Sequence, residues 1–265
     1  MRGTIIGDIV GSIFEFDNYK AIDFTPFFNP DAFFTDDTIC TIAIADSLLN
    51  NREPAVALHD WCNRYIDVGG FGNRFSIWLA SDDPKPYGST GNGSAMRISP
   101  VGLLASSLDE VATLTKMVTE VTHNTAPAIT GATATASAIY LARTGASKDE
   151  IAAYVTTVFG YDLSRSIEEI RATYTYSELA ENTCPEAICC ALQAHSFEEA
   201  IRNAISIGGD SDTIAAIVGG IAEALYGIPE GIQEQGISYL PEDMKKIVHL
   251  LYGNAYNRDL LVAAV

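Results

Sequence analysis

The 265-residue sequence predicts an all-α protein. Segments with helical spacing and recognisable helix starts recur along the whole chain, whereas no convincing run alternates polar and apolar residues as a strand would. Nothing resembles a linker between two domains, and the length suffices for one sizeable core. We therefore expect residues 1–265 to form one compact domain, an orthogonal multi-helix bundle.

Composition narrows the function classes. Hydrophobic residues make up 48% and charged residues 19%, which is typical of a soluble globular protein. The formal net charge of −18 argues against nucleic acid or an anionic membrane surface as a partner, although bound divalent ions could neutralise some of the acids. The five cysteines contain no CxxC pair, so neither a disulfide framework nor a zinc knuckle is indicated. With no secretory signal and no apolar run of about 18 residues, the expected location is the cytoplasm.

The first expected element is a helix over residues 3–16. Gly3, Gly7 and Gly11 are spaced by four residues and Glu15 continues the series, so a helix would place all four on one face. Glycine is a poor helix former, and three on one face imply that another element packs very close. Glu15 alone is better explained as a solvated acid at the helix end, because glutamate is seldom buried unpaired. Residues 17–34, rich in proline and aromatic residues without periodicity, are expected to be an ordered loop.

Two later segments share one pattern, in which acids and hydroxyls open an apolar helix. Thr35-Asp36-Asp37-Thr38 precedes the apolar residues from Ile39, and Gly208 to Thr213 precedes the apolar run from Ile214. A helix cap needs one carboxylate, and acids also suit the positive end of the helix dipole. A second copy weakens that simple explanation, since the two segments together offer the hard oxygen ligands that Mg²⁺, Mn²⁺ or Ca²⁺ prefers. The presence of two such segments therefore favours a metal site.

The middle of the chain is expected to hold short helices around a glycine-rich loop. Pro54 to Tyr65 is predicted as a helix with proline in its first turn, and a short amphipathic piece ends near Ala80. Residues 81–93 are the most turn-rich stretch and lead into a helix start at residues 94–98. Such a loop can cradle phosphate with its backbone N–H groups, but many loops of this kind are only connections.

The remaining chain is strongly helical. Ser147 to Glu150 and Ser196 to Glu199 fit the capping box. Residues 160–183 are polar and contain Tyr161, Tyr174 and Tyr176, which could form a site wall or lie on the surface. The expected helices are 108–121, 126–143, 148–158, 185–194, 197–207, 241–252 and the last ten residues.

Four ordered motifs together resemble the ADP-ribosylglycohydrolase family, of the dinitrogenase-reductase-activating-glycohydrolase type. They are Gly7 to Ser12 with Glu15, Thr35 to Thr38, Gly91 to Arg97, and Gly208 to Thr213, so the resemblance covers nearly the whole chain. It implies a compact all-α fold that holds two divalent ions, usually Mg²⁺ or Mn²⁺, in a cleft that binds ADP-ribose.

The resemblance also implies metal ligands. Thr35, Asp36 and Asp37 would hold one ion, Asp210 and Thr213 the other, and Asp212 would be shared. Glu15 would complete the site from a mobile segment, as a ligand or by positioning and deprotonating water. Glu15, Asp36 and Asp212 are thus the expected catalytic residues. Ser211 stands where threonine is frequent in the family, which should leave metal binding unaffected.

Substrate-binding residues are implied in the same way. The family's diphosphate-binding loop matches Ser89, Thr90, Gly91, Asn92 and Gly93. His123 matches a histidine near the distal part of ADP-ribose. Tyr174 or Tyr176 is a candidate for stacking on adenine.

The expected reaction is metal-dependent hydrolysis of the glycosidic bond between ADP-ribose and a modified side chain, with arginine first. Such cleavage passes through an oxocarbenium-like state and needs a placed water, which paired metal ions can activate. The expected partner is an ADP-ribosylated protein or a small ADP-ribose conjugate. Two alternatives remain: an ADP-ribose-binding module without catalysis, and a two-metal phosphoesterase that would yield AMP.

Overall fold

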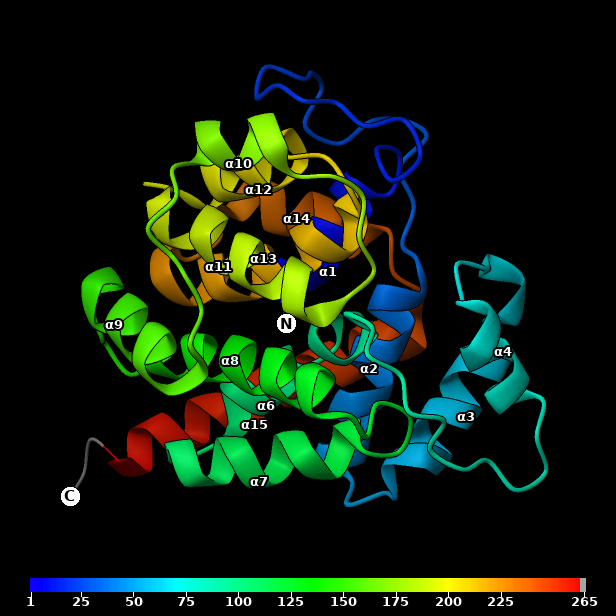
Figure 1. Cartoon of the computed structure of the whole chain (residues 1–265). Helices are drawn as coiled ribbons and strands as arrows, with labels where there is room; N and C mark the ends of the chain where they lie inside the picture. Colours follow the sequence, from blue (N-terminus) through cyan, green and yellow to red (C-terminus); the bar gives the residue numbers. More distant parts are fainter. Residues whose placement is uncertain (263–265) are drawn as a thin grey trace.

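The computed structural model describes residues 1–262, and in this range it contains helices but no strand (Figure 1). The all-α prediction is confirmed. The helices are α1 (Arg2–Gly11), α2 (Asp36–Leu49), α3 (Pro54–Arg64), η1 (Ile66–Val68), α4 (Asn73–Leu79), α5 (Gly93–Met96), α6 (Ser99–Leu104), α7 (Leu108–Thr119), α8 (Ala126–Arg143), α9 (Lys148–Phe159), α10 (Ile167–Thr173), α11 (Ala180–Gln193), α12 (Phe197–Ser206), α13 (Ser211–Tyr226), α14 (Glu230–Ser238) and α15 (Glu242–Val262).

Helix α13 is the centre of the molecule. It packs against α1, α8, α11 and α12, which enclose it on several sides (Figure 1). Every residue from Ser211 to Ala222 is buried. This explains why the segment is apolar all round rather than along one stripe, as expected of a helix with no solvent-facing side.

The glycines of α1 let it lie against α13 at backbone distance. A Cβ atom at Gly7 would lie 1.9 Å from the carbonyl oxygen of Ala215, and one at Gly3 would lie 2.0 Å from that of Gly219. At Gly11 the nearest atom would be Cα of Asp212, at 2.5 Å. The close contact expected from the spacing is therefore confirmed. At Gly11, the C-terminal end of α1, this contact lies beside Asp212, a predicted metal ligand.

Glu15 does not lie on the face of α1, because the helix ends at Gly11 rather than at residue 16. The chain turns there, with the Phe14 backbone N–H donating to the Gly11 carbonyl at 2.8 Å. The Asn18 side chain then donates to the carbonyls of Phe14 and Glu15, at 2.7 and 3.0 Å. These carbonyls find partners outside a helix, so the prediction of a helix through residue 16 is wrong.

Several other boundaries follow the sequence signals. The loop over residues 17–34 is confirmed, and α3 and α8 begin where predicted. The capping box of Ser147 and Glu150 is present in both directions at the start of α9. In α12 Ser196 accepts from the Glu199 backbone, but the Glu199 carboxylate bonds the His195 N–H instead.

Other helices differ from the predictions. α11 begins at Ala180, so Pro185 lies inside it rather than opening it. The Ala180 N–H donates to the Thr90 carbonyl at 3.0 Å, a contact that no local pattern shows. α10 and α14 were not predicted, although Ser166 and Glu169 form a full capping box for α10. The two helices expected from residue 241 onward are the single helix α15, and residues 263–265 lie outside the described range.

The length and composition of the helices bear on whether the protein could span a membrane. Within the described part of the chain, no helix has the length and apolar character needed to cross a membrane.

Candidate active site

The starts of α2 and α13 open into a cavity of about 330 Å³. Six carboxylates contribute to its wall. Five of them we call the acidic lining: Glu15, Asp36, Asp37, Asp210 and Asp212. The sixth is the exposed Glu178. Three basic side chains also contribute, and we call them the basic lining: Arg74, Arg97 and His123. Residues far apart in the sequence thus bring two opposite chemistries into one cavity.

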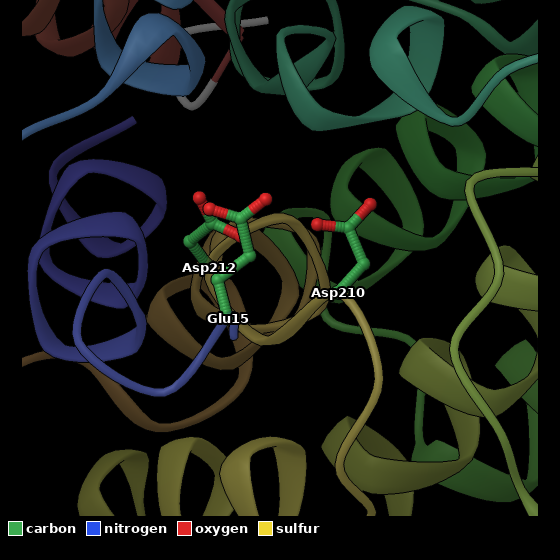
Figure 2. Close-up of side chains that lie close together, drawn as sticks. All are labelled: Glu15, Asp210 and Asp212. Carbon is green, nitrogen blue, oxygen red and sulfur yellow. The ribbon is translucent and has the colours of Figure 1, made fainter. Parts of the chain in front are cut away.

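The core of the acidic lining lies where the chain enters α13. Glu15, Asp210 and Asp212 each place a carboxylate oxygen within 4.8 Å of the other two. Figure 2 shows the three carboxylates on the same side of the start of α13. The turn before them requires glycine, since Gly208 and Gly209 have φ angles of +73° and +85°. Asn92 donates to the Asp210 carboxylate at 2.7 Å and so ties the glycine-rich loop to this cluster.

Asp36 and Asp37 join this cluster from the first turn of α2. The Thr213 hydroxyl donates to Oδ2 of Asp37 at 3.3 Å and thereby connects the starts of α13 and α2. Oδ1 of Asp37 is buried and has no hydrogen-bond partner among the described residues. Leaving a buried carboxylate oxygen unpaired is costly, so this atom is available to a cation.

Asp8 on α1 holds the start of α2 in place through hydrogen bonds, and the sequence analysis did not predict this role. Its fully buried carboxylate accepts from the Thr35 N–H at 2.9 Å, the Thr35 hydroxyl at 2.7 Å, the Thr38 N–H at 3.1 Å, and the Thr38 hydroxyl. Thr35 itself does not line the cavity. A lone acid inside the apolar stretch from Thr4 to Val10 was the signal that could have revealed this role.

Asn18 fixes the segment that carries Glu15. Its amide nitrogen donates to the Gly209 carbonyl at 2.9 Å as well as to Glu15, and its amide oxygen accepts from the Gly209 N–H at 2.7 Å. Glu15 is thereby tied to the turn that precedes Asp210. Asn18, like Asp8, was not among the predicted site residues.

Burial and mutual repulsion disfavour the charged form of the acidic lining. Burial, helped by neighbouring carboxylates, raises the pKa of Glu15 to about 7 and that of Asp36 to about 8. Burial likewise raises the pKa of Asp37 and Asp212 well above the ordinary value of aspartate, and it also raises that of Asp210. Among the described residues, none of the five forms an ion pair with lysine or arginine. A set of hard oxygen donors that no lysine or arginine pairs with fits a divalent metal ion.

The predicted substrate loop borders the same cavity. Ser89, Gly91, Asn92 and Gly93 line it, whereas the exposed Thr90 does not. The loop is held on both sides. The Thr125 hydroxyl donates to the Ser89 carbonyl at 2.6 Å, and the Asn92 N–H donates to the Glu178 carbonyl at 2.7 Å.

The two candidate tyrosines separate. Tyr176 lines the cavity and is exposed, so it can reach a ligand. Tyr174 does not line it, because its ring packs beneath the turn, where a Cβ at Gly209 would lie 2.6 Å from Cε1 of Tyr174.

His123 and two arginines complete the wall near the loop. His123 was predicted, but Arg74 and Arg97 were not, although Arg97 ends one of the recognised motifs. The Arg74 guanidinium lies over the ring of Tyr87, with Cζ 4.9 Å from the ring centroid, and donates to the Tyr87 carbonyl. Burial first, and then the charges of Arg97 and Arg74, hold the pKa of His123 well below its usual value.

Comparison with known proteins points to one family. The family model described as ADP-ribosylglycohydrolase matches residues 1–260. ADP-ribosylhydrolase ARH3 of Homo sapiens is 25% identical over 92% of this chain and 90% of its own length. ADP-ribosylarginine hydrolase Tri1 of Pseudomonas putida (strain GB-1) is 27% identical over 99% of this chain and 79% of its own length. The solved structure of an ADP-ribosylglycohydrolase-related protein complex aligns with a TM-score of 0.73 and 25% identity, covering 96% of this chain and 95% of that one.

Proposed function

The chain belongs to the ADP-ribosylglycohydrolase family and is a glycohydrolase, and from this premise we propose that it releases ADP-ribose from a modified arginine side chain with the help of two divalent ions. The observation that carries the proposal is the acidic lining: five carboxylates meet in one cavity, and among the described residues none of them forms an ion pair with lysine or arginine. Such an arrangement is unfavourable in the empty site and becomes favourable when metal binds.

The proposed ligands divide between the two helix starts. Asp36 and Asp37 would hold one Mg²⁺ or Mn²⁺ ion, Asp210 and Thr213 the other, and Asp212 would contact both. Thr35 retains one free lone pair for the first ion, because its hydroxyl donates to Asp8 and accepts from the Asp37 N–H at 3.2 Å. When bound, the ions would orient ribose hydroxyls and lower the pKa of a bound water.

Glu15 is the proposed general base. Its carboxylate is partly exposed within the cavity, so water can reach it. Burial raises the pKa of Glu15 to about 7 in the protein without metal. Its place in the cavity lets the carboxylate accept a proton from water and release it again. Asn18 would keep this carboxylate beside Asp210 and Asp212.

One comparison favours arginine as the acceptor residue. The relative aligned over 99% of this chain is named an ADP-ribosylarginine hydrolase. Names of other relatives, such as ADP-ribosylhydrolase ARH3, specify no acceptor residue.

A substrate panel tests the proposal. The protein with Mg²⁺ is incubated with arginine- and serine-ADP-ribosylated peptides, and the products are identified by mass spectrometry. We expect free ADP-ribose and an unmodified arginine peptide. AMP would instead indicate a phosphoesterase, and affinity for ADP-ribose without release would indicate a binding module. No release from any peptide, with metal shown to be bound, would contradict the proposal.

A further inference from the structure

Arg97 is a buried cation with few partners. It is 1% exposed, and it follows α5 at the wall of the cavity. Its Nη2 donates to the Thr122 hydroxyl at 2.7 Å, while its buried Nε has no hydrogen-bond partner among the described residues. In the same range it forms no ion pair with a carboxylate. Burying a guanidinium without a counter-charge is energetically unfavourable, and its unscreened positive charge acts on the polar groups around it.

The Thr122 hydroxyl connects Arg97 to His123. Thr122 is fully buried, and its Oγ1 lies 2.7 Å from Nη2 of Arg97 and 2.7 Å from Nδ1 of His123. A guanidinium can only donate, so Oγ1 accepts from Arg97 and has one hydrogen of its own to give. If Nδ1 carried the imidazole proton, that hydroxyl hydrogen would be buried without an acceptor. Nδ1 therefore accepts from Thr122, and Nε2 carries the proton.

The surroundings of His123 keep the imidazole neutral, so its tautomer matters. The charged or titratable side chains that face it are Arg97, Arg74 and Tyr87, whose ring centroid lies 6.1 Å from that of His123. Neither arginine can accept a proton from the imidazole, and both disfavour a positive charge on it. A neutral imidazole with Nδ1 occupied offers only one hydrogen to the cavity, at Nε2.

Nε2 lies against the glycines of the substrate loop. A Cβ at Gly93 would lie 3.3 Å from Nε2, and one at Gly91 would lie 3.6 Å from it. His123 lines the cavity but is only 5% exposed, and Nε2 has no hydrogen-bond partner among the described residues. The side chain is thus an unpartnered donor aimed into the space above the loop.

We infer that Arg97 and Thr122 are positioning residues that hold His123 as the Nε2–H tautomer, a neutral donor to an anionic oxygen above Gly91 and Gly93. The nearby Arg97 adds positive charge to this position while its hydrogen bond goes to Thr122. An anionic diphosphate oxygen therefore suits the position better than a neutral group. This inference rests on the proposed function for the identity of the ligand, ADP-ribose. The hydrogen-bond relay itself is a property of the free protein.

The test reads the tautomer directly. The protein is labelled with ¹⁵N-histidine, and His123→Gln assigns the His123 signals among the four histidines. We expect an N–H-type shift at Nε2 and an unprotonated-type shift at Nδ1 near pH 7. ADP-ribose should move the Nε2 resonance, whereas adenosine, which lacks the diphosphate, should leave it in place.

Variants at Thr122 separate the relay from packing. Thr122→Val removes the hydroxyl with little change in shape, so the tautomers should mix and ADP-ribose should bind about 10-fold more weakly. Thr122→Ser retains the hydroxyl and should restore both properties. Thr119→Val is the matched control, because the Thr119 hydroxyl is also buried but has no hydrogen-bond partner among the described residues.

Three results would overturn the inference. One is an Nδ1–H tautomer in the parent protein, which decides the matter even if Thr122→Val does not fold. Another is an unchanged tautomer in a folded Thr122→Val protein. The third is an equal loss of affinity in Thr119→Val. If ADP-ribose does not bind the parent protein, the proposed function and the identity of the ligand fail, while the ¹⁵N shifts still decide the relay.

Discussion

The acidic and basic linings share one cavity, yet burial acts on them in opposite directions. Removal from water raises the pKa of Glu15 and Asp36, to about 7 and about 8, and lowers that of His123. Neither lining is neutralised by the other, since the described residues contain no ion pair between them. The cavity therefore complements a ligand assembly with cations on one side and an anion on the other.

The two linings also differ in how the fold supports them. Four members of the acidic lining lie at the starts of the long helices α2 and α13, which the core and Asp8 hold in place, and the fifth, Glu15, lies in the segment after α1. In the basic lining, Arg74 lies on the short helix α4, Arg97 directly follows the short helix α5, and His123 lies in the loop before α8. Hydrogen bonds through Thr122, Asn124 and Thr125 hold this region. Changes in the acidic lining should therefore affect metal binding and chemistry, and changes in the basic lining should affect ligand affinity.

The largest effect is expected from Asp212→Ala. This residue is proposed to contact both ions, so its loss should abolish metal binding at the paired site and reduce hydrolysis on the order of 1,000-fold or more. Metal content by elemental analysis and ADP-ribose release are the measurements. An active Asp212→Ala protein would show that the metal site is misplaced.

Glu15→Gln should produce the next largest effect. The amide cannot accept a proton from water, so kcat should fall about 100-fold or more while ADP-ribose affinity changes little. Glu178→Gln is a suitable control, because Glu178 also lines the cavity but is exposed and is bonded by the Tyr176 hydroxyl at 3.2 Å. Equal losses in the two variants would remove Glu15 from the role of base.

Asp8→Asn tests whether the support beneath α2 matters. An amide would present a donor toward the N–H and hydroxyl groups of Thr35 and Thr38, and Mn²⁺ affinity should weaken by about 10- to 100-fold. Asp46→Asn is the matched control. Asp46 is a buried acid on α2 that binds Trp61 Nε1 at 2.8 Å and does not line the cavity, so its loss should lower stability but not metal affinity.

The smallest effect concerns pH and the metal-free protein. Carboxyls with raised pKa hold protons in the folded state that the unfolded chain has released, so folded stability falls as pH rises. The relevant window runs from the ordinary aspartate value of 3.8 to the value of about 8 for Asp36. We expect the melting temperature of chelated protein to drop by several degrees across this window, and added Mn²⁺ to remove the drop. A melting temperature that rises with pH in chelator would contradict this account of the acidic lining.

Local patterns were sufficient for much of the fold. Pro54 and the caps at Ser147 and Ser196 mark helix starts that the structure confirms, and the glycine spacing of α1 anticipated its contact with α13. The capping box at Ser166 is a local signal of the same kind, so the start of α10 is also encoded in the sequence around it.

The site shows where such patterns end. Asp210 and Asp212 could be recognised because they open an apolar helix. The position of Glu15 depends on Asn18, which donates locally to the Glu15 carbonyl and also to the carbonyl of Gly209, and the second bond is a contact between distant segments. The connection of Arg97 to His123 through Thr122 likewise needs three-dimensional proximity, since 24 residues separate Arg97 from the adjacent pair.

One measurement tests most directly whether the two linings serve one ligand: calorimetric titration of ADP-ribose into the chelated protein and into the protein loaded with Mg²⁺. If ribose hydroxyls meet the ions while the diphosphate meets the loop and His123, metal should tighten ADP-ribose binding by about 10-fold or more, and ADP-ribose should tighten metal binding by the same factor. Equal ADP-ribose affinity with and without metal would contradict the account.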